Sequence, residues 1–196
     1  MKKIIFTLTL FISTIGITNA QFDIANFYGG GDIGFSRPVG EISEFLAGGL
    51  TFSGSIGYSI DEKISVGIEY SSTLAAGIDT SGNSGFLGLN VYGLEQYLAT
   101  GQYRFLEGKF TPFVGLGLGV ARTQEPSFVD ANGMEVQSSR IGFGGKAEVG
   151  IALGGLMLKY AFALNGRTPE DTFFNINTSD LAVNYHRFTG GYIYNF

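Results

Sequence analysis

The sequence predicts an all-β fold, an eight-stranded antiparallel up-and-down barrel of the transmembrane kind. Bulky apolar and small polar residues alternate with a period of two along most of the chain, as in strands with two different faces. Glycine makes up 31 of 196 residues and only 15% of the residues are charged, whereas about 7% glycine and about 25% charge are usual. Short and long connections also alternate, which is typical of bacterial outer-membrane barrels.

The first twenty residues predict a secretory signal peptide. Lys2 and Lys3 precede an apolar run, which ends in polar and small residues before a cleavage site after Ala20. An uncleaved N-terminal membrane anchor is the alternative, and the polar residues within the run disfavour it. We therefore expect a signal peptide at 1–20 and one outer-membrane barrel domain at 21–196. Because the chain has no cysteine, disulfides and cysteine-based metal sites are excluded.

The first half of the mature chain contains four predicted strands. Residues 27–35 form the weakest of them, because they are rich in glycine. Residues 50–60 place bulky apolar side chains on one face and Thr, Ser and Gly on the other. Residues 64–70 repeat this division after a tight polar turn, and residues 97–105 show it once more.

The second half adds four strands. Residues 114–120 place glycine at every second position, and residues 188–196 end the chain. Between them, residues 141–151 and 156–162 flank Gly154-Gly155, which predicts a two-residue hairpin turn. Such a turn sets Gly150 opposite Lys159.

The connections after the second, fourth and sixth strands are short, and we expect them at the periplasmic end. The long connections, which we expect to be extracellular, cover 37–48, 73–90, 123–139 and 165–184. Asn132-Gly133 in the third of these is a strong hairpin signal, and a protruding ribbon used as a docking edge is one interpretation of it. Residues 86–94 and 165–184 have room for more strand, so ten strands remain an alternative.

Charged side chains within the strands fall on the small-residue face, while the opposite face is bulky and apolar. That small-residue face carries too little charge for the outer surface of a soluble exported barrel, which is the alternative. It fits the lumen of a narrow barrel whose bulky face meets lipid. The predicted lumen charges are Asp32, Glu69, Arg104, Lys146, Glu148, Lys159 and Arg187.

These lumen charges must pair, because an isolated buried charge is very costly. The predicted hairpin puts Glu148 diagonal to Lys159, within reach of a salt bridge. Barrel closure makes the first and last strands neighbours and so places Asp32 and Arg187 on adjacent strands. We expect a structural polar plug rather than an ion path, because eight strands leave room only for side chains.

Sequence signals for chemistry are weak. Residues 29–34 match G-x-G-x-x-G, but no helix or βαβ unit follows, and Gly145-Lys146 lacks the Ser or Thr of a P-loop. His186 is the only histidine; a Ser–His–acid site with Asp180 is conceivable, although a position at the rim of the barrel explains it better. We expect no enzymatic activity, no cofactor and no metal. The acidic long loops also disfavour nucleic acid as a partner.

The signal peptide, the eight alternating segments, the strand at 111–119 and the terminal residues 192–196 resemble the small OmpA/OmpX-type outer-membrane barrels. The resemblance covers essentially all of 21–196. It implies that the final strand is read by the barrel-insertion machinery, through Tyr192, Tyr194 and Phe196.

The resemblance further implies a monomer in the outer membrane of a diderm bacterium, exported through the periplasm and surrounded by outer-membrane lipid. Because this family includes structural proteins, adhesins, secretion accessories and one acyl-transfer enzyme, the fold does not choose among activities. A structural or adhesin-like surface-interaction role with a salt-bridged, plugged lumen is our prediction. The alternatives are a narrow pore, a secretion-system accessory barrel and a lipid-modifying enzyme. An extracellular or periplasmic protein partner stays open.

Overall fold

A computed structural model describes part of the chain, and the predicted signal peptide at 1–20 and Phe196 lie outside that part. No described helix is long and apolar enough to cross a membrane. The described residues are 24–40, 43, 46–78, 89–124, 128–129, 135–136, 139–165, 172–173, 176–177 and 184–195.

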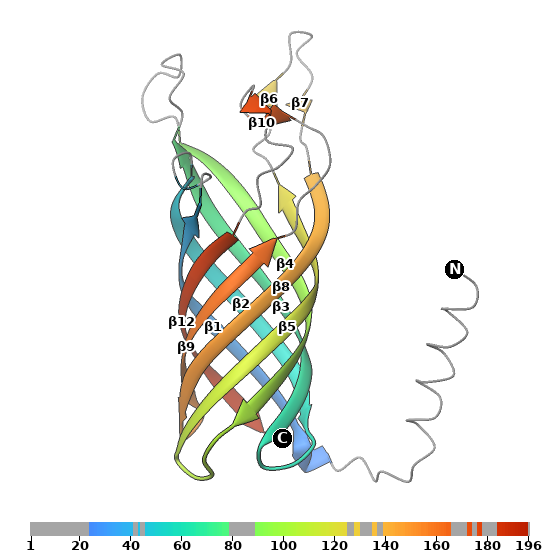
Figure 1. Cartoon of the computed structure of the whole chain (residues 1–196), viewed down its shortest axis with the longest axis vertical. Coiled ribbons are helices and arrows are strands. Elements are labelled where there is room, and N and C mark those ends of the chain that lie inside the picture. The colour runs from blue at the N-terminus through green and yellow to red at the C-terminus, as the bar shows by residue number, and fades with distance from the viewer. Residues whose placement is uncertain are drawn as a thin grey trace, which may run out of the picture.

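Eight antiparallel strands close into a barrel in the order β1-β12-β9-β8-β5-β4-β3-β2, which confirms the predicted fold (Figure 1). A short 3-10 helix, η1 (Ile24–Asn26), leads into the first strand. The barrel strands are β1 (Phe27–Val39), β2 (Leu46–Ser59), β3 (Ile64–Ile78), β4 (Leu89–Arg104), β5 (Phe110–Gln124), β8 (Ser139–Leu153), β9 (Leu156–Asn165) and β12 (Asn184–Asn195). Each strand pairs with its sequence neighbour in the barrel, and β1 pairs with β12 to close the wall.

Two small hairpins lie outside the barrel sheet. β6 (Phe128–Val129) pairs with β7 (Glu135–Val136), and β10 (Thr172–Phe173) pairs with β11 (Ile176–Asn177). The first of these flanks the predicted Asn132-Gly133 turn, which itself lies outside the described residues. Because both hairpins form separate sheets, the described barrel has eight strands rather than ten.

The strands extend further into the long connections than the side-chain pattern predicts. β3 and β4 pair as far as Ile78 with Leu89, so both ends of the expected loop at 73–90 are strand. Strand pairing uses only backbone N–H and C=O groups, and it therefore continues beyond the segment in which apolar and small side chains alternate. The connections between barrel strands that replace the four expected loops are 40–45, 79–88, 125–138 and 166–183.

The turns at the opposite end are tight, as predicted. Gly154 and Gly155 have φ of 57° and 102°, which suits the two central positions of a hairpin turn that requires positive φ at both. The resulting register sets Gly150 opposite Lys159, which confirms the predicted pairing. In the turn between β2 and β3, Asp61 Oδ1 accepts hydrogen bonds from the backbone N–H of Lys63 and Ile64, at 2.8 and 2.6 Å.

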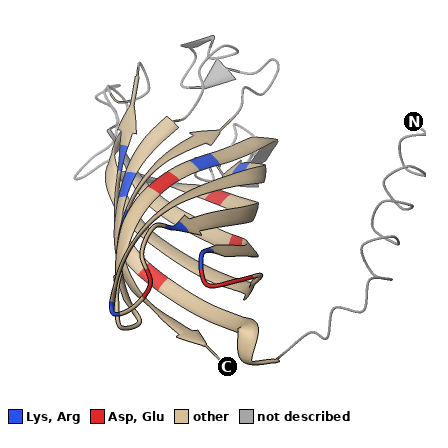
Figure 2. Cartoon of the chain, turned by 60° about the horizontal axis from the view of Figure 1, so that its bottom comes forward, with Lys and Arg blue, Asp and Glu red and all other residues tan. Residues whose placement is uncertain are grey.

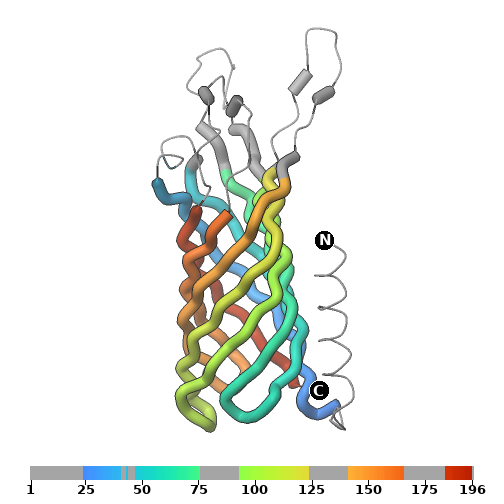
Figure 3. Tube along the Cα trace, turned by 45° about the vertical axis from the view of Figure 1, so that its right-hand side comes forward, coloured from blue at the N-terminus to red at the C-terminus, as the bar shows by residue number. Residues whose placement is uncertain are grey.

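The two faces of the barrel wall follow the alternation. On β5, Leu116 and Leu118 point outward and are 67% and 63% exposed, whereas the alternating Gly115 and Gly117 face the lumen and are buried. The strands tilt around the barrel in one continuous wall (Figure 3). The bulky face is therefore outside and the small-residue face inside, as predicted.

Candidate functional site

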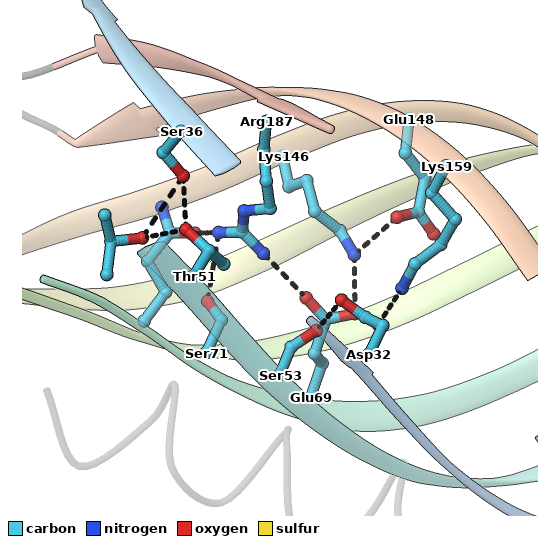
Figure 4. A network of polar contacts seen from close by, with 12 residues as sticks. Asp32, Ser36, Thr51, Ser53, Glu69, Ser71, Lys146, Glu148, Lys159 and Arg187 are labelled. Carbon is cyan, nitrogen blue, oxygen red and sulfur yellow. Dashed lines mark hydrogen bonds and ion pairs between the residues drawn. The ribbon is translucent and has the colours of Figure 1, made fainter. Parts of the chain in front are cut away.

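All of the predicted lumen charges lie on inward-facing positions of the strands. Lys146 and Arg187 are each only 3% exposed, and Glu69, Glu148 and Lys159 are also buried. Basic and acidic positions are interspersed along the barrel wall (Figure 2). Six of the seven charges form ion pairs in one polar network of the lumen (Figure 4). Arg104 makes no ion pair with a described residue.

Lys146 is the centre of this network. Its Nζ lies 2.6 Å from Glu69 Oε2 on β3 and 2.7 Å from Glu148 Oε2 on its own strand β8. Glu69 Oε1 also lies 3.5 Å from Nη1 of Arg187 on β12. These contacts join three strands that are not neighbours in the sheet, so the ion pairs reach across the lumen.

Asp32 and Lys159 form a second pair in the same region. The Lys159 ammonium contacts the Asp32 carboxylate, which also accepts a hydrogen bond from the Ser53 hydroxyl. The expected salt bridge between Glu148 and Lys159 is therefore wrong. Lys159 extends across β12 to pair with Asp32 on β1. Glu148 pairs with Lys146, which precedes it by two residues on the same face of β8.

Asp32 and Arg187 lie on adjacent strands, as predicted, but their side chains do not pair. In the register of β1 and β12, Asp32 is opposite Gly191 and Arg187 is opposite Ser36. The offset along the strands directs Arg187 to Glu69 instead. Strand adjacency alone was thus insufficient to identify the partner.

Neutral side chains extend the network toward the long connections. Nη2 of Arg187 donates hydrogen bonds to Ser71 Oγ, Gln96 Oε1 and Tyr185 Oη at 3.1, 3.1 and 3.2 Å. Gln96 in turn donates through Nε2 to Asn165 Oδ1 at 2.8 Å. The sequence pattern did not predict these residues, although strand parity places Gln96 on the same face of β4 as Arg104.

A cluster of buried hydroxyl groups lies beside Arg187. The hydroxyls of Ser36, Thr51 and Thr73 contact one another, with Thr51 Oγ1 2.6 Å from Thr73 Oγ1 (Figure 4). Each hydroxyl both donates and accepts, so three of them satisfy one another without a charge.

Glycines on β5 make room for the charges. A Cβ on Gly115 would lie 2.7 Å from Oε1 and 2.8 Å from Cγ of Glu148. Since real Cβ atoms do not approach so closely, a side chain here would displace the carboxylate. Gln102 Nε2 on β4 donates to the same carboxylate at 3.0 Å, so Glu148 is held from two sides.

The network balances in charge. Three carboxylates, from Asp32, Glu69 and Glu148, meet three cationic groups, from Lys146, Lys159 and Arg187, and each group has an opposite charge within 3.5 Å. Buried ion pairs persist only where geometry and added hydrogen bonds offset the loss of hydration. Among the described residues, no group of three or more His, Asp or Glu gathers as a metal site.

His186 lies on the outer face and not in the lumen. Its Nδ1 is 2.5 Å from Tyr160 Oη, and its ring stacks on Tyr160 at 5.6 Å and tilts against Phe162. An aromatic neighbourhood of this kind suits the rim interpretation of the sequence. Asp180, the acid considered for a Ser–His–acid site, lies outside the described residues.

Two of the three residues assigned to barrel insertion, Tyr192 and Tyr194, lie near the end of β12. Tyr192 and Tyr194 point outward and are exposed, next to the short-turn end of the barrel. Phe196 is outside the described residues, so the role of this terminal motif stays a prediction.

No protein-family model matches this sequence, and a search among curated proteins found no match. Solved structures do match. Neisserial surface protein A (NspA) aligns with a TM-score of 0.60 and 16% identity, covering 87% of this chain and 97% of that chain. Ail, the attachment invasion locus protein of Yersinia pestis, aligns with a TM-score of 0.53 and 14% identity, covering 86% and 99%. The chain therefore has the closed eight-stranded barrel fold of the small outer-membrane proteins of the OmpA/OmpX type.

Proposed function

We propose that this chain is a monomeric outer-membrane barrel with a structural or surface-interaction role, no enzymatic activity, and a lumen closed by its charge network. One observation carries the proposal: bulky apolar side chains cover the outside of the barrel, and seven charged side chains of its strands lie on the lumen face. Soluble monomers rarely expose apolar patches larger than a few hundred Å². Lipid is the solvent that suits such a surface.

Aromatic pairs near both ends of the apolar surface support this placement. At the short-turn end, Phe27 packs on Tyr58 and Tyr103 on Phe105, with ring centroids 5.2 and 5.3 Å apart. Toward the other end, Tyr160 packs on His186 and Phe188. Aromatic girdles at both membrane–water interfaces are typical of outer-membrane barrels.

The outward-facing charges also support a membrane boundary. Glu95 on β4 and Arg122 on β5 are opposite each other on the outer face, with Arg122 Nη1 3.8 Å from Glu95 Oε2. Tyr70 donates to Glu95 Oε1 at 3.2 Å. Because charged side chains on a lipid-facing wall are costly except near the interfaces, this cluster marks the end of the apolar band toward the long connections.

An unpaired strand edge supports a role in surface interaction. β8 pairs with β5 up to Ser139, whereas β9 reaches only Gly144 on the other side of β8. Within the described part of the chain, residues 139–143 therefore have one edge without a partner strand. Such an edge offers N–H and C=O groups for the addition of a strand from another protein. A docking edge on this side is part of the proposal.

Cell fractionation combined with heat-modifiable mobility on gels tests the membrane assignment. We expect the mature chain in the outer-membrane fraction, with a folded band that shifts on boiling. Recovery of the chain in the soluble periplasmic fraction would overturn the proposal. A separate measurement on purified protein in planar bilayers tests the closed lumen: we expect no steady conductance, and regular single-channel steps would favour the narrow pore.

A further inference from the structure

A cavity of about 270 Å³ opens at the short-turn end of the lumen. Its lining includes Gln102, Arg104, Phe113, Met157 and Ile193, which come from β4, β5, β9 and β12. Gln102 also donates to Glu148, so the cavity ends where the charge network begins. The cavity therefore lies between the short-turn end of the lumen and the charge network.

Arg104 gives this cavity a positive charge. The six other lumen charges pair among themselves, three of each sign, and Arg104 makes no ion pair with any residue that the structure describes. Its side chain is half-buried at the end of β4, opposite Phe113 on β5. A guanidinium carries five N–H donors in a planar fork that matches a carboxylate.

Apolar side chains form the wall beside Arg104. Phe113 and Met157 are both only 4% exposed, and Ile193 is half-buried. The Phe113 ring lies over Gly150 on β8, where an added Cβ would come within 2.5 Å of the Phe113 Cζ atom. The glycine therefore leaves space for the ring to pack against β8. Small-molecule sites combine apolar walls with a few polar or charged groups that orient the ligand.

We propose that this cavity, the mouth pocket, binds a small carboxylate with an apolar body. The carboxylate pairs with Arg104, and the apolar body lies against Phe113 and Met157. The pocket is slightly smaller than the sites of about 300–1,000 Å³ that hold drug-sized ligands, so a single ring or a short chain fits it. That the pocket faces the periplasm rests on the proposed function, whereas the binding itself does not.

Methionine methyl NMR on the refolded barrel in uncharged micelles tests the proposal. Met157 lies in the pocket, while Met134 belongs to the long connection between β5 and β8 and serves as an internal reference. The probe is hydrocinnamate, and hydrocinnamyl alcohol is the matched neutral compound. We expect hydrocinnamate to shift the Met157 signal saturably, with a much smaller effect of the alcohol and no effect on Met134.

Two substitutions separate binding from partition into the micelle. Arg104→Gln removes the charge, and we expect affinity for hydrocinnamate to fall by about tenfold or more, since hydrogen bonds to charged groups are the strong ones. Arg122→Gln removes an arginine from the outer face, and we expect unchanged affinity. Heat-modifiable mobility verifies that both variants are folded.

Three results would overturn the mouth pocket. These are the absence of a saturable Met157 shift, equal shifts by acid and alcohol, and equal affinity in the wild-type and Arg104→Gln proteins. None of them bears on where the protein resides in the cell. Conversely, a chain recovered from the soluble fraction would contradict the proposed function and leave the measured binding intact.

Discussion

Replacement of Lys146 with methionine tests whether the buried charges stabilise the barrel as one network. Lys146 Nζ lies 2.6 and 2.7 Å from two carboxylates. Without it, Glu69 keeps only Arg187 at 3.5 Å as an ion-pair partner, and Glu148 keeps a hydrogen bond from Gln102. Removing one partner of a buried ion pair typically costs about 3–5 kcal/mol. Because Glu69 loses the nearer of its two cationic partners and Glu148 loses its cationic partner, we expect the upper part of that range.

Urea unfolding of the refolded barrel measures this cost. The chain has no tryptophan, so far-UV circular dichroism and the folded band on gels report the transition. Lys109→Met is the matched control, because Lys109 is exposed in the turn between β4 and β5. We expect the control to change the free energy of unfolding by less than about 0.5 kcal/mol.

A second variant separates loss of the network from loss of packing. If the cost comes from unpaired carboxylates, adding Glu148→Gln to Lys146→Met recovers part of the lost stability, because only Glu69 remains short of a partner. The two substitutions are then non-additive, as contacting residues in one ion-pair network are. A fall of less than about 1 kcal/mol in the free energy of unfolding of Lys146→Met would refute a stabilising network, because breaking a buried ion pair typically costs more. Strict additivity of the two substitutions in the double variant would refute it as well.

Five further substitutions test glycine spacing, turn geometry and the histidine. Gly115→Ala places a Cβ 2.7 Å from a carboxylate oxygen, so we expect the free energy of unfolding in urea to fall by about 1–3 kcal/mol. In the control Gly101→Ala, the Cβ meets open space, and we expect almost no change. Equal effects of the two substitutions would contradict the crowded lumen. Gly155→Ala forces a residue with a side chain to a φ of 102°, and we expect the free energy of unfolding to fall by about 1–3 kcal/mol. Gly154→Asn places asparagine at a φ of 57°, which it tolerates, so we expect a smaller fall. The reverse order would be inconsistent with this turn. His186→Ala should leave lipid acyl composition unchanged by mass spectrometry, and an altered composition would favour the lipid-modifying enzyme.

Local patterns in the sequence predicted the strands and turns well. Each predicted strand core overlaps an observed barrel strand, and Gly154-Gly155 set the register of β8 against β9. The strand ends were less predictable. Beyond Tyr70, β3 continues to Ile78 through backbone pairing with β4, although Ser72 interrupts the bulky apolar residues of the outer face there.

The ion-pair partners within the network could not be predicted from the sequence, for a different reason. Lys146 and Glu69 are 77 residues apart and lie on β8 and β3, which do not pair. Whether two such side chains meet depends on the diameter of the barrel and the stagger of its strands. The prediction of a bridge between Glu148 and Lys159 used the register of one hairpin alone and was therefore wrong.

The sequence by itself determined which side chains face the lumen and which face outward, because a strand exposes successive side chains to opposite sides and the two sides differ in size and charge. It also determined that the inward charges nearly balance. Only the tertiary structure decided that Lys146 joins two carboxylates and that Arg104 stays outside the network at the mouth of the lumen. Those outcomes depend on distances across a closed barrel, which arise only when the first and last strands pair.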